Sequence, residues 1–250
     1  MTSNQIGTMS WLKESGGNLT VKSRLSLLSK VLVPSMSGFL KMNIRYGKRK
    51  NVSFDDIPFP DSAAVKIALE EIESCASPSV LEHSFRTYFW GAGLGKTESL
   101  KFDSEFLLVS CLLHDLGMTQ KHRNHDCSCF AADSAVVAAE VMKRANWETD
   151  KLESLSEVIC LHMNGHVDVS QGAEAHLLQQ AAAYDIVGSR YYDLQKAYRD
   201  AVLQKHPRNN INEDFTTFIA KEKKLHPDSR AALMHNVGLP LMIKLNPYSD

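Results

Sequence analysis

The sequence lacks a long hydrophobic run and an excess of charge of either sign. Its 250 residues contain no stretch of about 18 uninterrupted apolar residues, so we expect no membrane-spanning helix. Lysine and arginine together number 28 against 29 aspartates and glutamates, which leaves a formal net charge of −1. This balance gives no case for binding to nucleic acid or to an anionic membrane. We therefore expect neither a membrane protein nor a nucleic-acid-binding protein.

Cysteine is scarce as well. The five cysteines are an odd number, and no pair shows the double spacing of a zinc ribbon. A disulfide framework is unexpected in a chain of this length. Cys111 and Cys160 fall within apolar helical patterns, where a small core residue is the usual role. We predict free thiols and a cytoplasmic location.

Acidic residues are missing between Ser15 and Phe54, a segment whose charged side chains are all basic: Lys22, Arg24, Lys30, Lys41, Arg45, Lys48, Arg49 and Lys50. Lys30 interrupts its apolar stretch and no small-residue cleavage site follows, which does not fit a secretory signal. We favour a helix that packs on the domain, or a tail. An organelle transit peptide and a helix that meets an anionic partner stay open. We predict a basic N-terminal extension over residues 1–53, with disordered stretches allowed, and a separate domain over 54–250.

Alternation of apolar and polar residues is absent over any length that would demand a strand. Helical patterns fill nearly everything after "FDDIPFPDS" at 54–62. Capping residues predict three helix starts, at Asp61 or Ser62, at Ser77 with Pro78 in the first turn, and at Asp103 or Ser104. Further helices are expected over 131–145, 151–163, 173–188, 193–204, 213–223 and 228–236. The sequence predicts an all-α fold, a compact multi-helix bundle.

A histidine and an aspartate end the most apolar of these helices. The run Phe106–Leu113 is typical of an element buried on all sides, and "LLHDLG" at 112–117 follows it with His114 and Asp115. Two polar groups in such a place are costly unless a hydrogen-bond network, an ion pair or a metal ion satisfies them. Gly117 then stands where a left-handed C-cap would end the helix.

Other predicted helices carry polar residues in similar apolar surroundings. His83 lies in "LEHSFRTYFW", and Asp185 interrupts the alanines of "AAAYDIVG". A lone buried histidine is more often a hydrogen-bonded core residue, but an ionised carboxylate in an apolar run needs a cation or several donors. Two imidazoles and two carboxylates on different helices can converge on one divalent ion. This mixed set suits Zn²⁺, Mn²⁺ or Fe²⁺, disfavours Ca²⁺, and leaves positions open for water, as in a catalytic site.

The order of these residues resembles the H…HD…D signature of the HD metal-dependent hydrolase superfamily, over about residues 60 to 240. "EHSFRTYFWG", "VSCLLHDLG" and "YDIVG" are similar to its cyanamide hydratase-like branch. The resemblance implies that His83, His114, Asp115 and Asp185 bind a divalent metal, with zinc favoured and iron or manganese as alternatives. It also implies that activated water attacks a small nitrogen-containing substrate. Cyanamide, which would yield urea, is the specific expectation.

Further residues are candidates for the surroundings of this site. His162 in "CLHMNGH" is our first choice for proton transfer or substrate contact, and His166 is the second. Exposure to solvent at a helix end is their ordinary alternative. Side chains that could wall a pocket for a very small molecule are Arg86, Trp90, Phe130 and Tyr192. An ion pair for Arg86 and core packing for the aromatic residues are the alternatives.

The sequence departs from the branch after the HD helix. A Phe-Glu pair usual there is Phe130-Ala131 here, which weakens the case for cyanamide, with Asp126 or Asp133 as a candidate substitute. His122 and His125 are candidates for a second metal or the substrate. A two-metal phosphohydrolase acting on a nucleotide or phosphoester is therefore the alternative function, and a non-catalytic binding module with a structural metal is a weaker one. The expected partner is a small-molecule substrate, and a homo-oligomer is compatible with the sequence.

Overall fold

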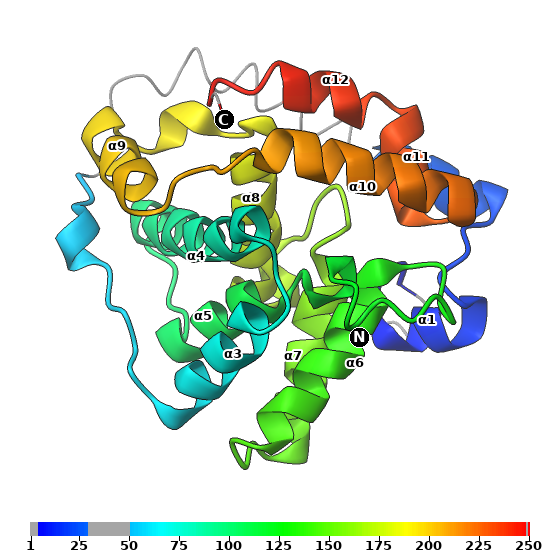
Figure 1. Cartoon of the computed structure of the whole chain (residues 1–250), viewed down its shortest axis with the longest axis horizontal. Coiled ribbons are helices and arrows are strands. Elements are labelled where there is room, and N and C mark those ends of the chain that lie inside the picture. Colours follow the sequence, from blue (N-terminus) through cyan, green and yellow to red (C-terminus); the bar gives the residue numbers. More distant parts are fainter. Residues whose placement is uncertain (1–4, 30–50, 249) are drawn as a thin grey trace.

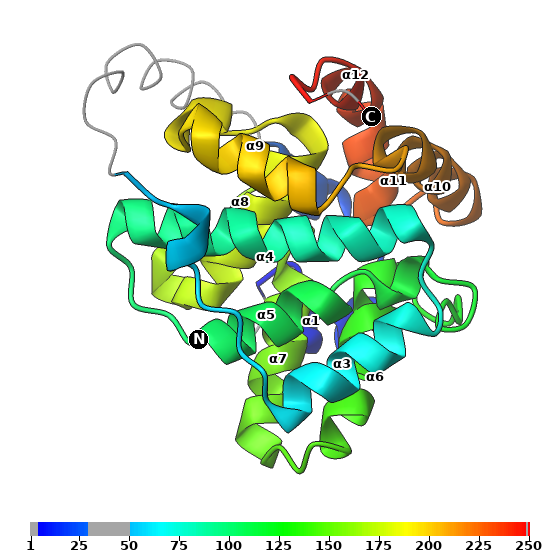
Figure 2. The same cartoon turned by 60° about the vertical axis from the view of Figure 1, so that its left-hand side comes forward.

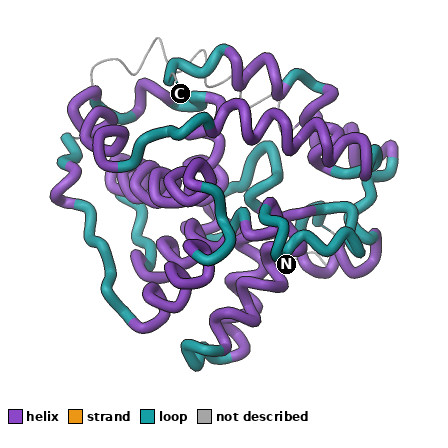
Figure 3. Tube along the Cα trace, viewed as in Figure 1, coloured by secondary structure: helices purple, strands orange, loops and turns teal. Residues whose placement is uncertain are grey.

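The structure, a computed structural model, describes residues 5–29, 51–248 and 250. Among these residues the chain forms helices joined by loops and contains no strand (Figures 1 and 3), which confirms the predicted all-α fold. No helix in this part of the chain is long and apolar enough to cross a membrane. The five cysteines are free thiols, as predicted. Six of the basic residues predicted to mark the N-terminal extension lie outside the described residues: Lys30, Lys41, Arg45, Lys48, Arg49 and Lys50.

Three helices form the centre of the bundle. They are α4 (Pro78–Glu98), α5 (Ser104–Leu113) and α8 (Ala173–Val187), and each packs against the other two. Every residue of α5 from Phe106 to Leu113 is buried, as expected of a helix that is apolar all round. Helix α3 (Ala63–Glu73) packs on α5, and Figure 2 shows α9 (Lys196–Lys205) on the other side of α4.

The remaining helices surround this centre. A short connection joins α6 (Phe130–Lys143) to α7 (Thr149–Leu161), and the two pack side by side as a hairpin (Figure 1). The C-terminal helices α10 (Ile211–Leu225), α11 (Arg230–Asn236) and α12 (Leu239–Lys244) pack on one another. Through α12 they contact α8, and through α10 they contact α4. Helix α12 was not predicted from the sequence, and neither was the N-terminal helix α1 (Met9–Ser15).

The first described residues pack on the helical bundle. Trp11 and Leu12 of α1 (Met9–Ser15) are buried, and α1 contacts α7. The backbone N–H of Met9 donates to the Glu157 carboxylate at 3.1 Å. Residues 21–29 are helical as well. This part of the predicted extension therefore lies against the bundle, and a domain boundary at residue 54 stays a prediction.

Side-chain caps set the starts of the three helices that precede the HD pair. Ser62 accepts from Val65 N–H at α3 and Ser77 accepts from Val80 N–H at α4, where Pro78 occupies the first turn. Asp103 accepts from the first N–H groups of α5. These contacts confirm the predicted caps, each of which satisfies donors that the helix itself leaves unpaired.

Gly117 has a different role from the one predicted. It is not among the described residues of positive φ, and it lies within η2 (Leu116–Met118), a short 3₁₀ turn that follows the HD pair. A Cβ at this position would lie 2.1 Å from the carbonyl oxygen of Phe130. Its N–H donates to Ser134 Oγ at 2.8 Å. The glycine is therefore required for close approach of α6, not for a left-handed cap.

Candidate metal centre

Three helices bring polar side chains to one buried point in the bundle. His83 lies on α4, His114 and Asp115 follow the last turn of α5, and His162 caps the end of α7. All of them are at most 7% exposed. Helix α5 presents its pair here because its apolar sides are packed against α3, α4, α7 and α8, so that its C-terminal end lies in the interior.

The side-chain atoms of this group converge on the Asp115 carboxylate. His114 Nε2 lies 3.1 Å and His83 Nε2 lies 3.5 Å from Asp115 Oδ2. His162 Nε2 lies 3.6 Å from the other oxygen, Oδ1. His83, His114 and Asp115 offer ligand atoms that all lie within 4.8 Å of one another. One small ion can therefore reach these three residues, and His162 lies beside Asp115 as a further candidate ligand.

The other ring nitrogen of each histidine is already used. His114 Nδ1 lies 2.7 Å from the Cys111 carbonyl oxygen, and His162 Nδ1 lies 2.6 Å from that of Ile159. His83 Nδ1 lies 2.7 Å from Asp185 Oδ2. Carbonyl and carboxylate oxygens only accept, so each Nδ1 carries a proton and Nε2 is the nitrogen left to face Asp115. Three Nε2 atoms thus face one carboxylate, and a divalent cation among them would bind both kinds of group.

Unsatisfied atoms give an independent test of whether a metal fits. His114 Nε2 and Asp115 Oδ1 are both buried and have no hydrogen-bond partner. A buried polar atom without a partner costs about 1–3 kcal/mol, and here two such atoms face the same point. A divalent ion bound to them would remove both costs. The residues present therefore fit a divalent metal.

The electrostatics agree with ligand chemistry. Burial opposes the charged form of Asp115, but the adjacent His114 and the hydrogen bond from His83 outweigh it and hold the pKa of this carboxyl well below its usual range. Burial, with the charge of His114, lowers the pKa of His162 to about 3. An ionised carboxylate and a neutral imidazole are the forms that bind metal ions.

Asp185 was predicted as a ligand, but in the structure its carboxylate is hydrogen-bonded to other side chains. Its carboxylate accepts from Arg86 Nε and Nη2 and from Trp90 Nε1, each at 2.8 Å, and from Arg208 at 3.4 Å. Burial would raise the pKa of this carboxyl, but Arg86, His83 and Arg208 outweigh burial and lower it well below its usual range. Both oxygens of this carboxylate accept hydrogen bonds, so Asp185 contacts the metal centre only indirectly, through the Nδ1 atom of His83.

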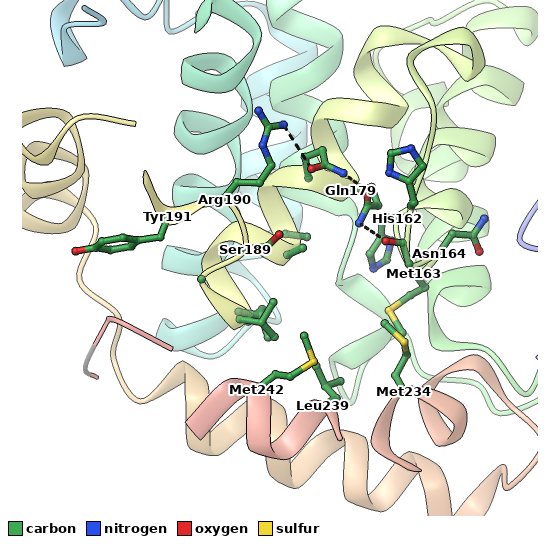
Figure 4. A pocket seen from close by; sticks show the side chains of 18 of the residues that line it. His162, Met163, Asn164, Gln179, Ser189, Arg190, Tyr191, Met234, Leu239 and Met242 are labelled. Atoms are coloured by element: carbon green, nitrogen blue, oxygen red, sulfur yellow. Dashed lines mark hydrogen bonds between the residues drawn. The ribbon is translucent and has the colours of Figure 1, made fainter. Parts of the chain in front are cut away.

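The metal centre opens into a cavity of about 780 Å³. Helix α8, the segment after α7, the loop around η4 (Tyr191–Asp193) and the C-terminal helices line it. Figure 4 shows His162 and Gln179 on one side of this space and Leu239 and Met242 on another. His166 and Tyr192, both predicted near the site, are among the lining residues.

Three residues expected to wall the pocket lie in the core instead. Arg86, Trp90 and Phe130 are 0% exposed, and none of them lines the cavity. Arg86 and Trp90 face Asp185, because this buried carboxylate needs their donors. Phe130 packs edge-to-face on Phe218. The ordinary alternatives, an ion pair for Arg86 and core packing for the aromatic residues, describe these positions.

The two loop histidines lie away from the cavity. His122 Nε2 lies 2.9 Å from Glu71 Oε1, in a group that includes Cys75. His125 Nδ1 lies 3.1 Å from His226 Nε2 on the surface. Neither histidine lines the cavity, so the structure does not bring them to the metal centre.

The proposed substitutes for the missing glutamate are also elsewhere. Asp133 forms an ion pair with Arg123 and accepts from the Asn124 N–H. Asp126 is exposed. Neither of them lines the cavity, and Ala131 is fully buried. The cavity holds no carboxylate from this part of the chain.

Sequence reasoning missed Glu98 and His176, which line the cavity wall together with Arg190. Glu98 at the end of α4 lies 2.5 Å from Arg190 and 3.4 Å from His176 on α8. Arg190 also binds Asp193 at 2.8 Å. The one signal of this group in the sequence was His176, a histidine within the apolar pattern of α8. Glu98 and Arg190 stand at element ends, where charged residues are usually solvated.

Comparison with known proteins agrees with this geometry. The family model described as "HD domain" matches residues 80–187, a span that contains His83, His114, Asp115, His162 and Asp185. Two cyanamide hydratases of Saccharomyces cerevisiae, DDI2 and DDI3, are each 24% identical to the chain over 178 residues. These alignments cover 68% of this chain and 77% of each relative. The match over residues 80–187 identifies an HD domain, and the similarity to the two cyanamide hydratases supports a metal-dependent hydratase or hydrolase.

Proposed function

We propose that the protein is a zinc-dependent hydratase of nitrile groups, with the conversion of cyanamide to urea as its reference reaction. The observation that carries this proposal is the convergence of three histidine Nε2 atoms on the buried Asp115 carboxylate. The S. cerevisiae relatives named cyanamide hydratases support the choice of reaction. In this reaction the water oxygen bonds to the nitrile carbon, both π bonds of C≡N are replaced by the σ and π bonds of the new C=O group, and both water protons end on the nitrogen.

The ligands proposed for the metal are His83, His114, Asp115 and His162. Imidazoles with one carboxylate favour Zn²⁺, and Fe²⁺ or Mn²⁺ are the alternatives. A divalent ion in this place supplies a Lewis acid that lowers the pKa of water to near neutrality. Asp185 orients His83 from behind, as carboxylates commonly do for metal-binding histidines. His166, which lines the cavity, is the proposed proton donor to the substrate nitrogen.

The two-metal phosphohydrolase has less support. His122 and His125, its candidate second-metal ligands, bind Glu71 and pair with His226 instead. Arg190 is the one lysine or arginine among the described residues that line the cavity, and it is bound to Glu98 and Asp193. Phosphate recognition uses free cationic donors. The residues that line the cavity therefore favour an uncharged substrate over a phosphoester.

Metal content tests the ligand set. We expect about one equivalent of zinc per chain in the wild type and none in His114→Ala or His162→Ala, measured by elemental analysis after gel filtration. Asp185→Asn should still bind zinc, with an affinity about 10–100-fold lower, because it weakens the support of His83 without removing a ligand. His166→Ala is the matched control and should keep a full equivalent. Full zinc content in His162→Ala would contradict the proposed set.

Urea release tests the reaction. The zinc-loaded wild type should convert cyanamide to urea, and His114→Ala should release no urea above the uncatalysed rate. Thermal melting of both proteins checks that the variant is folded. Turnover of phosphoesters without any urea would instead support the two-metal alternative.

A further inference from the structure

The cavity is far larger than cyanamide. Its volume of about 780 Å³ falls in the range of roughly 300–1,000 Å³ typical of pockets for drug-sized ligands. One water needs only about 10–15 Å³ on this scale, so cyanamide would leave most of the space to solvent. Productive orientation needs contacts that hold the reacting carbon in place. The volume therefore favours a longer substrate.

Apolar side chains form a part of the cavity wall that is separate from the ion-paired Glu98 and Arg190. Met163 follows His162, Met234 lies on α11, and Leu239 and Met242 lie on α12. Figure 4 shows Met163 and Met234 pointing toward each other, with Leu239 and Met242 beside them. Thioether side chains adapt to irregular apolar groups and contact aromatic rings favourably. This methionine wall, formed by the four residues named here, fits an apolar substituent.

The charges in the cavity disfavour an anionic substituent. Apart from Asp115, which the proposed metal would bind, two carboxylates line the cavity, from Glu98 and Asp193, against the single guanidinium of Arg190. Glu98 and Asp193 already bind that guanidinium at 2.5 and 2.8 Å. A second anion would have to displace one of these carboxylates or face them without a counter-ion. The substrate should therefore be neutral.

We propose that the substrate is a neutral N-substituted cyanamide, R–NH–C≡N, whose apolar group R lies against the methionine wall. The proposal rests on the hydratase function above. The oxygen of water bonds to the nitrile carbon, both π bonds of C≡N are replaced by the σ and π bonds of the new C=O group, and both protons of water end on the former nitrile nitrogen. The product is the N-substituted urea, and no further reactant is needed.

Three compounds test this substrate class on the zinc-loaded full chain. Benzylcyanamide carries a neutral apolar group, 4-carboxybenzylcyanamide carries the same group with a negative charge, and cyanamide carries none. Each urea product is measured by liquid chromatography and mass spectrometry. We expect kcat/KM for benzylcyanamide to exceed both other values at least about tenfold, because only this compound gains the apolar contacts without a charge penalty.

A matched pair of variants tests the methionine wall itself. Met242→Trp narrows the cavity and should lower the ratio of kcat/KM for benzylcyanamide to that for cyanamide at least about tenfold. Leu241→Trp changes the neighbouring residue, which is 60% exposed and does not line the cavity, and should keep the ratio. Thermal melting confirms that both variants fold.

Each experimental outcome tests a different part of the proposal. If cyanamide is hydrated as efficiently as benzylcyanamide, the substrate class is overturned while the hydratase stands. Equal turnover of the carboxylated compound overturns the requirement for a neutral substrate. An unchanged ratio in Met242→Trp overturns the role of the wall. If the fully zinc-loaded protein produces no urea from any compound, the hydratase function is overturned, and the substrate class with it.

Discussion

Asp185 and His162 show how burial and partners decide what a single residue does. Asp185 is fully buried and accepts from Arg86, Trp90 and His83, which leaves its oxygens no direction open toward a metal. His162 has its Nδ1 bound to a backbone carbonyl and its Nε2 facing Asp115. Because hydrogen bonds fix which nitrogen is protonated, a second partner on each histidine selects the atom that can bind metal.

Glu98 offers a pH-dependent test at the scale of one residue. Burial would raise its pKa, but His176 and Arg190 outweigh burial and lower it to about 2 from the ordinary value of 4.5. A lowered pKa stabilises the fold above pH 4.5, and this contribution is lost as the pH falls toward 2. Urea unfolding of Glu98→Gln should therefore show a smaller loss of stability than the wild type between these pH values.

The matched control for this experiment is Glu73→Gln, at an exposed position on α3. It should lose stability in acid as the wild type does. If Glu98→Gln and the wild type lose the same free energy of unfolding over this pH range, the ion pair with Arg190 does not stabilise the fold.

At the scale of the element, the turn after α5 determines how closely α6 approaches the metal centre. Gly117 in η2 donates to Ser134 Oγ, and Ser134 lies on α6. Because α6 also packs on α7, which carries His162, the short turn couples the HD pair to a third histidine. The α6–α7 hairpin thus fixes the distance between residues that are far apart in the sequence.

Gly117→Ala tests this close approach. Its Cβ would lie 2.1 Å from a backbone oxygen that cannot rotate away, so we expect a loss of about 3 kcal/mol or more in the free energy of unfolding. Gly91→Ala on α4 is the control, because its Cβ would meet its nearest neighbour at 3.5 Å. That variant should be neutral or slightly stabilised, by up to about 1 kcal/mol. Equal stability of the two variants by urea denaturation would contradict the proposed role of the turn.

At the scale of the whole molecule, the metal centre connects helices that would otherwise meet only by packing. The proposed ligands come from α4 and from the ends of α5 and α7. An ion that binds the folded chain but not the unfolded chain stabilises the fold in proportion to the logarithm of its concentration over Kd. Metal loading should therefore raise the stability of the whole bundle.

Chelation tests this coupling. With zinc at about 1,000 times Kd, the stabilisation is about 4 kcal/mol, so removal by a chelator should lower Tm by roughly 10 °C for a chain of this size. Calorimetry with and without chelator measures the change. His114→Ala should melt at the same temperature under both conditions. A wild-type Tm that does not respond to chelator would argue against a metal bound across these helices.

The sequence alone determined the fold class and the buried polar pair at the end of α5. A continuous apolar run, Phe106–Leu113, is a local signal, and so are the caps at Ser62, Ser77 and Asp103. The HD pair was predictable because two polar groups after such a run require compensation. These properties depend on neighbours in the chain, which the sequence displays directly.

Only the tertiary structure decided how the remaining residues divide between core, support and cavity. The sequence placed Arg86 and Trp90 near the site, but their orientation toward Asp185 depends on how α4 packs against α8. The partnership of Glu98 with Arg190 likewise joins distant segments. Such contacts arise from the packing of whole helices, and hydrophobic burial fixes that packing without leaving a local pattern in the sequence.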